Sequence, residues 1–402
     1  MRFPEFSGEW VKYQVSDVLD FYSTNSLSWD QLEYHSDKLL NLHYGLIHVG
    51  LPTAVSLDEN VLPNIKKEFL PKNYELCREG DVAFADASED TNEVAKAIEF
   101  VNLSDKSVVC GLHTIHGRDN KNLTSIGFKG YAFASESFHN QIRRLAQGTK
   151  IFSISSKNFT ECFIGIPSKD EQTKIAIFLA LIDERISTQI RIIEKTKSLI
   201  KGLANLIMDN PSDCIKYLLG DLCEIKSGYS GNQLIGNNGL RVSRIETISN
   251  HHINLDRVGF VAPFEKSEEY KLNIGDILFS NINSVEYIGN TAYIDKDYSL
   301  YHGMNLLRLI PQKPIVSPFF LYCLLNTDRL KNHFKTICNK AVSQASINQT
   351  ELSKIPLLLP DMSKQIQIAN LFKLLLGKKE IELSYYTLLI KQKKYLLSKL
   401  FI

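Results

Sequence analysis

The chain has 402 residues, of which 44% are hydrophobic and 23% are charged. At roughly 150 residues per domain, this length favours two or three globular domains, and the ordinary composition excludes a disordered or fibrous protein. Apolar runs such as residues 178–182 are far shorter than the roughly 18 residues that a membrane span needs. Glu5 and Glu9 interrupt any apolar leader, and the seven cysteines form no Cys-x-x-Cys pair. We therefore expect a cytoplasmic protein with reduced thiols and no membrane contact.

The net charge of +1 is unevenly distributed. Residues 1–165 carry 16 Lys and Arg against 22 Asp and Glu, whereas residues 166–402 carry 30 against 23. A globally basic surface therefore cannot be the basis for binding nucleic acid. Any such binding must depend on local patches or on a basic partner.

Residues 1–167 are expected to form a mixed α+β globule. Short alternating runs of β-branched and aromatic residues are separated there by Gly, Asn and Asp turns. We interpret Gly80, in Glu79-Gly80-Asp81-Val82, as a turn glycine with positive φ.

Residues 168–210 are expected to form one long helix. No proline occurs between Glu171 and Met208, and Gly202 is the only helix breaker there. Apolar residues recur at a spacing of three and four, interrupted by the polar Gln189 and Thr196, which is typical of a helix that pairs along its length. At 1.5 Å per residue it would be about 55 Å long, too long for one small domain. The residues predicted to pair are Leu179, Ile182, Ile186, Ile193, Ile200 and Leu203.

Residues 211–359 repeat the first globule. Val11-Lys12-Tyr13 recurs as Ile215-Lys216-Tyr217, and Gly80-Asp81 recurs as Gly275-Asp276. Such matches appear in the same order with slowly drifting offsets, which predicts two tandem copies and a pseudo-twofold internal repeat. Gly275 is interpreted as a turn glycine like Gly80.

Residues 360–402 are expected to form a second long helix. Leu374, Ile381, Leu388 and Tyr395 recur every seven residues. We expect the two helices to pair as an antiparallel coiled coil that separates two mixed α/β globules, an α+β architecture overall. The alternative, an ordinary core helix in each domain, is disfavoured by the length and the heptad spacing.

Catalytic signatures are missing from the sequence. It contains no phosphate-binding GxxxxGK[ST] loop, no HExxH and no GxSxG, and no histidine pair has cysteines at zinc-ligand spacing. Residues 210–213 lack the second proline and the aromatic of an adenine-methylating motif, and Asp256 with Glu269 and Lys271 is too common a pattern to indicate a nuclease. We predict no catalytic residue and no metal ligand in this chain.

Several motifs together resemble the specificity (S) subunits of type I restriction-modification enzymes. The opening Arg2-Phe3-Pro4-Glu5-Phe6 and the segment Glu171-Gln172-(x2)-Ile175-Ala176 are similar to that family's chain start and first helix. Residues 80–90 with 111–114 resemble one type of target recognition domain, and residues 275–289 with 302–305 resemble another. The resemblance covers essentially the whole chain. In the second copy, however, Lys364 and Leu376 replace the acidic residues of the helix signature.

The resemblance implies a DNA sequence-recognition subunit without catalysis of its own. Two target recognition domains would read the two halves of an asymmetric, bipartite target in double-stranded DNA, at a spacing set by the helices. Two methyltransferase subunits and two restriction (motor-nuclease) subunits would be its partners in a bacterial defence system. S-adenosylmethionine, ATP and Mg²⁺ would belong to those partners, with no cofactor on this chain. We expect the isolated chain to bind DNA weakly.

Polar residues on turns after strands are the candidates for DNA contact. For each Asn or Ser among them, turn formation or helix capping is the alternative role. In the first globule the candidates are Asp86, Ser88, Glu89, Asp90, His113 and Arg118 for bases, and Lys121, Lys129, Arg143, Arg144 and Lys150 for phosphates. In the second they are Arg241, Arg244, Ser280, Asn281, Asn283, Tyr287, Asn305, Gln344, Ser346 and Asn348.

Two other functions remain open. One is a duplicated DNA-acting enzyme, either a nuclease or a methyltransferase. The other is a coiled-coil adaptor whose globules bind proteins. An assay of the isolated chain with Mg²⁺ or S-adenosylmethionine tests the first, and co-expression with a methyltransferase subunit tests the second.

Overall fold

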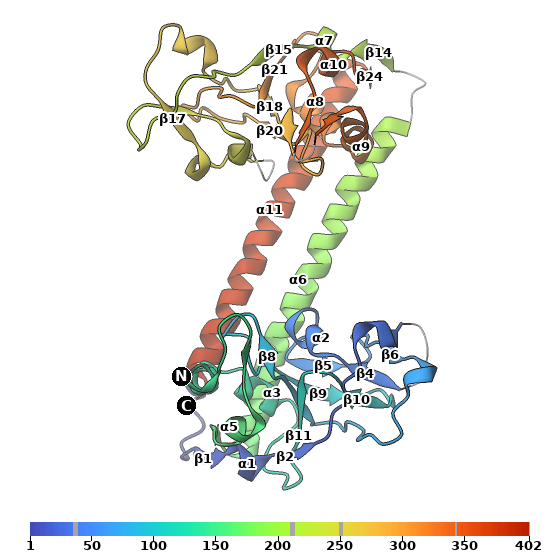
Figure 1. Cartoon of the computed structure of the whole chain (residues 1–402), viewed down its shortest axis with the longest axis vertical. Helices are drawn as coiled ribbons and strands as arrows, with labels where there is room; N and C mark the ends of the chain where they lie inside the picture. Colours follow the sequence, from blue (N-terminus) through green and yellow to red (C-terminus); the bar gives the residue numbers. More distant parts are fainter. Residues whose placement is uncertain (35–38, 210–213, 249–251, 342–343, 402) are drawn as a thin grey trace. The chain divides into compact units, whose positions relative to one another are not determined.

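The computed structural model describes residues 1–34, 39–209, 214–248, 252–341 and 344–401 (Figure 1). The chain divides into two compact units. Unit 1 consists of Met1–Arg191 and Ser384–Ile402, and unit 2 consists of Ile192–Leu383. The division falls inside both long helices, so each unit contains a globule and one part of each helix, whereas the sequence prediction placed its boundaries at the helix ends.

Unit 1 is built on two sheets. The first consists of β2 (Asp20–Tyr22), β5 (Ala54–Ser56), β7 (Val82–Ala85), β9 (Ala97–Asn102) and β11 (Thr114–Arg118), in the order β2-β11-β7-β9-β5. The second consists of β3 (Leu32–Glu33), β4 (Leu40–Leu42), β6 (Asn64–Ile65) and β10 (Val108–Cys110), in the order β10-β4-β6-β3. Pairing is antiparallel except between β5 and β9 and between β10 and β4. Its other strands and its shorter α-helices are β1 (Val11–Gln14), β8 (Ala87–Ser88), β12 (Phe152–Ser153), β13 (Phe163–Ile166), α1 (Val15–Val18), α2 (Tyr44–His48), α3 (Phe128–Phe133), α4 (Glu136–Leu145) and α5 (Ser156–Thr160).

The core of unit 1 is rich in aromatic rings. The ring of Phe84 of β7 contacts that of Phe133 of α3 edge to face at 4.9 Å, and it contacts the tilted ring of Phe159 of α5 at 4.6 Å. All three side chains are fully buried, and edge-to-face ring pairs stabilise a core beyond the area that they bury. The helices α3, α4 and α5 are thereby fixed on the sheet that contains β7.

Unit 2 repeats this plan with fewer strands. Its main sheet, in the order β15-β21-β18-β20, consists of β15 (Cys223–Ser227), β18 (Ile277–Phe279), β20 (Thr291–Tyr293) and β21 (Leu307–Pro311). The smaller ladders use β14 (Ile215–Leu218), β16 (Leu240–Val242), β17 (Gly259–Val261), β19 (Ile282–Asn283), β22 (Asn339–Lys340), β23 (Ala345–Ser346) and β24 (Pro356–Leu359). Its shorter helices are α7 (Leu219–Leu222), α8 (Pro318–Leu325), α9 (Asp328–Ile337) and α10 (Gln349–Ser353).

The internal repeat is visible in matching ladders. β1 pairs antiparallel with β13, and β14 pairs in the same way with β24. β8 pairs with β12, and β19 pairs with β23. Gly80 and Gly275 precede the equivalent strands β7 and β18 with φ of 87° and 101°, a conformation that a β-carbon disfavours, so both turn-glycine predictions are confirmed. The sequence offsets therefore predicted which elements correspond.

One glutamine in each unit joins the globule to its long helix. The helices are α6 (Lys169–Asp209) and α11 (Met362–Lys399). Gln172 of α6 donates to the carbonyl oxygen of Pro167 at 2.9 Å and accepts from the backbone N–H of Ser125 at 2.7 Å. Gln365 of α11 donates to the carbonyl oxygen of Pro360 at 2.9 Å and accepts from the N–H of Ser317 at 2.9 Å. Both side chains are buried, and each makes two hydrogen bonds to the backbone of its globule. Each helix therefore starts at a fixed angle to that globule.

Each unit contains contacts between the two long helices. In unit 1 the Lys393 ammonium of α11 lies 2.6 Å from the Asp183 carboxylate of α6, so the end of α11 meets the beginning of α6. In unit 2 Ala204 of α6 and Phe372 of α11 share one apolar cluster, so the beginning of α11 meets the end of α6. The helices therefore run antiparallel, and the predicted fold class is confirmed.

The predicted pairing stripe of α6 faces inward. Leu179, Ile182 and Ile193 are buried, and Ile186, Ile200 and Leu203 are half-buried. The polar interruptions Gln189 and Thr196 are buried as well. Thr196 donates to the carbonyl oxygen of Ile192, one turn earlier, which satisfies its hydroxyl within the helix.

The predicted pairing stripe of α11 was wrong by one residue. Leu374, Ile381, Leu388 and Tyr395 are 73%, 70%, 60% and 53% exposed. The buried line uses their neighbours instead, including Leu389 and Leu396. Because apolar residues stand next to each other in α11, as Leu388 and Leu389 do, two heptad stripes were possible. The prediction used the more uniformly apolar stripe. The residues of α11 that face inward include half-buried polar ones such as Lys393, which forms an ion pair with Asp183.

Candidate nucleic-acid interface

The first group of predicted DNA contacts lies where β7 ends and β8 begins. Asp86 occupies this turn, and its carboxylate lies 3.1 Å from Nδ1 of His113. His113 is half exposed and has φ of 55°, so the turn presents its ring to solvent. Ser88 of β8 accepts a hydrogen bond from the backbone N–H of Asp90 at 3.1 Å, which shapes the loop that follows. The structure thus brings four of the predicted residues together, and Glu89 between them is exposed.

The predicted phosphate-binding residues of unit 1 are scattered. Arg143 of α4 is held by Glu136 and Asn140, and it donates to Asn92 at 3.0 Å. Arg144 and Lys150 are exposed. The Lys121 ammonium donates to the carbonyl oxygen of Asp17 at 2.7 Å. Arg143 and Lys121 thus have partners within unit 1, whereas Arg144 and Lys150 are exposed to solvent.

Three predicted DNA contacts are corrected by the structure, because their side chains are buried. Ser280 is fully buried at the end of β18 and accepts from the Asn283 amide at 3.1 Å. Lys129 of α3 lies 3.0 Å from the buried Glu99 carboxylate, which also accepts from two glycine N–H groups. Arg118 of β11 is 5% exposed. A cation committed to a buried carboxylate is not available to DNA.

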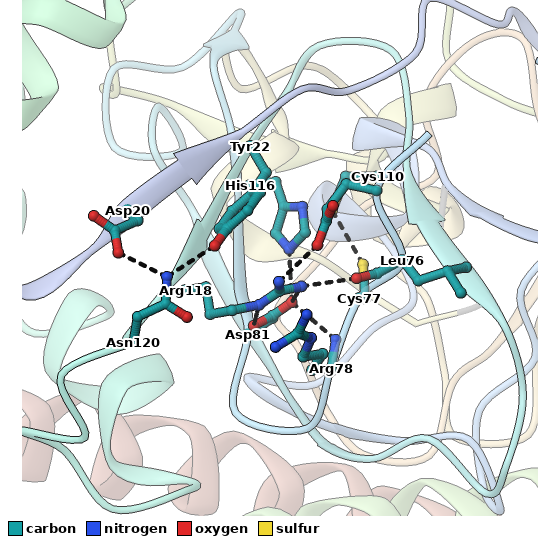
Figure 2. Close-up of polar contacts among 11 residues, drawn as sticks. Asp20, Tyr22, Leu76, Cys77, Arg78, Asp81, Cys110, His116, Arg118 and Asn120 are labelled. Atoms are coloured by element: carbon teal, nitrogen blue, oxygen red, sulfur yellow. Dashed lines mark hydrogen bonds and ion pairs between the residues drawn. The ribbon is translucent and has the colours of Figure 1, made fainter. Parts of the chain in front are cut away.

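Figure 2 shows the buried network around Arg118. Its guanidinium donates to both oxygens of the Asp81 carboxylate, through Nε at 2.9 Å and through Nη2 at 2.8 Å. Its Nη1 donates to Glu75 at 2.6 Å. Burial alone would raise the pKa of Asp81, but hydrogen bonds from His116 and Arg118 outweigh it and lower that pKa. Asp81 also accepts from the backbone N–H of Arg78 at 2.8 Å, so one carboxylate organises the turn before β7.

Unit 2 repeats the central ion pair. Arg308 of β21 reaches the Asp276 carboxylate through Nε at 2.8 Å and Nη2 at 2.6 Å, and the backbone N–H of Asn273 donates to Asp276 at 2.7 Å. Here burial raises the pKa of Asp276 despite the opposing effect of Arg308. The Gly-Asp motif found twice in the sequence is therefore a structural anchor in both units.

The predicted contacts of unit 2 gather around the β19–β23 ladder. Ile282 and Asn283 of β19 pair with Ser346 and Ala345 of β23, and Asn281 donates weakly to the carbonyl oxygen of Ile347 at 3.4 Å. Tyr287 is 49% exposed. Gln344 and Asn305 are exposed as well, and Asn348 caps α10 by accepting from the N–H of Glu351 at 2.8 Å. The ladder equivalent to β8–β12 thus presents amides and a phenol where unit 1 presents carboxylates and a histidine.

Arg241 and Arg244 belong to a separate part of unit 2. Arg241 of β16 donates to the carbonyl oxygen of Tyr298 at 3.2 Å, and Arg244 is exposed. In the same unit the rings of Tyr229 and Phe264 stack at 3.8 Å, and Tyr270 contacts both rings edge on. No sequence pattern predicts this aromatic group, because its members are far apart in the chain and no regular spacing links them.

Comparisons with known proteins agree with this architecture. Residues 211–398 match the family model of the type I restriction modification DNA specificity domain. The putative type I restriction enzyme MjaX specificity subunit of Methanocaldococcus jannaschii is 42% identical over 200 residues, 48% of this chain and 46% of that protein. The EcoKI specificity subunit of Escherichia coli is 23% identical over 266 residues, 61% of this chain and 57% of that protein. The matched region thus spans about half the length of these curated relatives.

Two solved structures share the fold. The type I restriction-modification S subunit from M. genitalium superimposes with a TM-score of 0.59 at 18% identity, covering 100% of this chain and 99% of that one. A chain from a structure on assembly and conformational transition of the type I R-M system gives 0.60 at 17% identity, covering 98% and 97%.

Two tandem α/β units with antiparallel long helices are the architecture that this molecule shares with these solved structures. Residues 211–398 match the type I restriction modification DNA specificity domain and the chain shares the fold of a solved type I S subunit, so the resemblance that the sequence motifs suggested is confirmed. Among the described residues, no helix is both long enough and apolar enough to cross a lipid bilayer.

Proposed function

We propose that this chain is the DNA sequence-recognition subunit of a type I restriction-modification complex. Its two units would read the two unlike halves of one bipartite target in double-stranded DNA. The chain itself would be non-catalytic and cytoplasmic, and S-adenosylmethionine, ATP and Mg²⁺ would bind to partner subunits. Those partners would be two methyltransferase and two restriction subunits.

The observation that carries the proposal is that one framework presents two different surfaces. Both units keep the buried Asp–Arg pair and the glutamine at the start of each long helix. The exposed groups beside the equivalent ladders differ, with Glu89 and His113 in unit 1 and Tyr287 and Gln344 in unit 2. Base edges in the major groove are distinguished by the pattern of donors and acceptors that meets them. Different side chains on the same framework therefore suit two different half-sites.

The test is to co-express the chain with its neighbouring methyltransferase subunit and to sequence the methylated adenines of the host genome. We expect methylation within two unlike half-sites separated by a fixed number of unspecified base pairs. Gln344→Ala should relax one half-site, and Glu89→Ala should relax the other, each by about 1–3 kcal/mol per lost base contact. Turnover of DNA by the isolated chain with Mg²⁺ or S-adenosylmethionine would support a duplicated enzyme. An assembly that binds no DNA would support a protein adaptor.

The helices provide a second test, because the proposal gives them the role of setting the half-site spacing. Seven residues inserted into both α6 and α11 keep the heptad phase and lengthen each helix by about 10 Å. At about 3.4 Å per base pair, the spacer should grow by about three base pairs while both half-sites stay unchanged. The matched control places seven residues in the exposed loop at Ile235 and should leave the spacer unaltered. An unchanged spacer in the helix variant contradicts the proposed role.

A further inference from the structure

Unit 1 contains a buried trio of metal-binding side chains that the proposed function does not use. Cys77 precedes β7, Cys110 ends β10, and His116 lies in β11. One ligand atom from each lies within 4.8 Å of the other two, and the three residues are 6%, 1% and 1% exposed. In the part of the chain that the structure describes, this is the one group of three or more such residues. We propose that Cys77, Cys110 and His116 bind a structural Zn²⁺ ion.

The separation of the two sulfur atoms fits zinc. Zn²⁺ binds thiolates at about 2.3 Å in tetrahedral geometry, which places two sulfur ligands about 3.8 Å apart. The Sγ atoms of Cys77 and Cys110 lie 3.6 Å apart, and both cysteines are free rather than disulfide-bonded. Two thiolates would also neutralise the charge of a divalent ion, which a buried site requires.

The histidine is oriented as a zinc ligand would be. Its Nε2 lies 2.7 Å from Oδ2 of Asp81, whereas its Nδ1 is buried with no hydrogen-bond partner. In Figure 2 the ring lies between Asp81 and Cys110. Metal-binding imidazoles commonly use one nitrogen for the metal and the other for a carboxylate that fixes the ring. A metal on Nδ1 would satisfy a nitrogen that is otherwise buried without a partner, which is unfavourable for folding.

Asp81 is rigid enough to hold the ring in this position. It is itself buried and fixed by Arg118 and by the backbone N–H of Arg78. Two thiolates and an imidazole are a soft ligand set that selects Zn²⁺ over Mg²⁺ or Ca²⁺. Three protein ligands leave one coordination position for water.

Unit 2 shows that the framework does not need these three residues. The N–H of Cys77 donates to the carbonyl oxygen of Val108, and the N–H of Leu272 donates to that of Leu300 in the equivalent place. In the strand registers, His116 pairs with Ala83, two residues after Asp81, and Arg308 pairs with Leu278, two residues after Asp276, so Arg308 stands in the place of His116. Leu272, Leu300 and Leu306 belong to one buried apolar cluster. Unit 2 thus has a leucine in the place of Cys77 and an arginine in the place of His116, so it lacks two of the three ligands.

The equivalent of Cys110 in unit 2 is His302. The N–H of Asn25 donates to the carbonyl oxygen of Cys110 at 3.0 Å, and the N–H of Tyr229 donates to that of His302 at 2.9 Å. The His302 imidazole is already satisfied by the Leu306 carbonyl oxygen at 3.0 Å. The asymmetry between the units therefore predicts one zinc ion per chain rather than two.

The test measures metal in the purified full-length chain. We expect about one equivalent of zinc by mass spectrometry, and replacement by Co²⁺ should give the intense visible bands of a tetrahedral site with a thiolate charge-transfer band. Cys110→Ser should lose at least tenfold in zinc content and should lose the charge-transfer band. Cys162→Ser, which removes a buried thiol of the same unit outside the trio, should retain both.

Two outcomes overturn the proposal. The first is wild-type protein that holds no zinc after growth and purification with zinc and takes up no Co²⁺, including the case in which Cys77 and Cys110 are found as a disulfide. The second is retention of metal by Cys110→Ser. Cys77→Leu, which places in unit 1 the residue that unit 2 has there, keeps the test decisive if Cys110→Ser misfolds, because it should fold and lose at least tenfold in zinc content.

Discussion

Units 1 and 2 share a framework of polar anchors but differ in the side chains around it. The comparison shows which residues the fold requires and which are particular to one unit. Both retain a buried Asp–Arg pair, a turn glycine with positive φ and a glutamine that joins the globule to a long helix. Around the ion pair, unit 1 has Cys77 and Cys110 beside His116, whereas unit 2 has Leu272 and His302 at the places of the two cysteines. A few polar anchors therefore define this fold, while the side chains between them are free to change.

The largest expected effect comes from breaking the shared ion pair. Asp81→Asn leaves the buried Arg118 guanidinium without its main counter-charge, and we expect unit 1 to lose about 3–5 kcal/mol. Asp276→Asn should affect unit 2 in the same way but less strongly, because Asp276 has no histidine partner comparable with His116. Hydrogen exchange of the β7 and β18 amides in the full chain measures each unit separately. Equal losses, or losses below 1 kcal/mol, would contradict this difference between the units.

A smaller effect should distinguish the units by pH. Burial lowers the pKa of His302 to about 4, against about 6.5 in an unfolded chain. Above pH 6.5 the imidazole is neutral in both states, so the stability is fully present there. As the pH falls from 6.5 towards 4 the unfolded state binds the extra proton, and unit 2 should lose about 3 kcal/mol.

The measurement is hydrogen exchange of the β21 amides between pH 7 and pH 4, in the wild type and in His302→Gln. The variant cannot take up the proton, so its stability should fall less over this range. The prediction fails if both proteins lose stability in parallel.

The smallest effect concerns the glutamines at the helix starts. Gln172→Ala leaves the Ser125 N–H and the Pro167 carbonyl oxygen without this partner, and Gln365→Ala does the same to Ser317 and Pro360. We expect about 2 kcal/mol from each, because an unsatisfied buried polar group costs about 1–3 kcal/mol. Chemical denaturation of the full chain checks this, with Gln367→Ala on the exposed face of α11 as a near-neutral control. A loss confined to one of the two variants would show that the anchors are not equivalent.

Sequence patterns predicted the repeat and the long helices because both depend on local periodicity and on matches along the chain. The heptad of α11 was misplaced because Leu388 and Leu389 are both apolar, and only the packing partner decides which of them is buried. Arg118 was mistaken for a DNA contact because its carboxylate partner, Asp81, is 37 positions away in the sequence. The grouping of Cys77, Cys110 and His116 could not be predicted from the sequence for a related reason. Strand pairing brings these residues together, not their spacing along the chain.

The outward row of Leu374, Ile381, Leu388 and Tyr395 on α11 has a practical consequence. Hydrocarbon groups that face water attract one another, and sulfate or phosphate salts strengthen that attraction. Purified protein should consequently precipitate at lower ammonium sulfate concentrations than a Leu374→Gln/Leu388→Gln variant. Storage buffers for this protein are best chosen without salting-out anions.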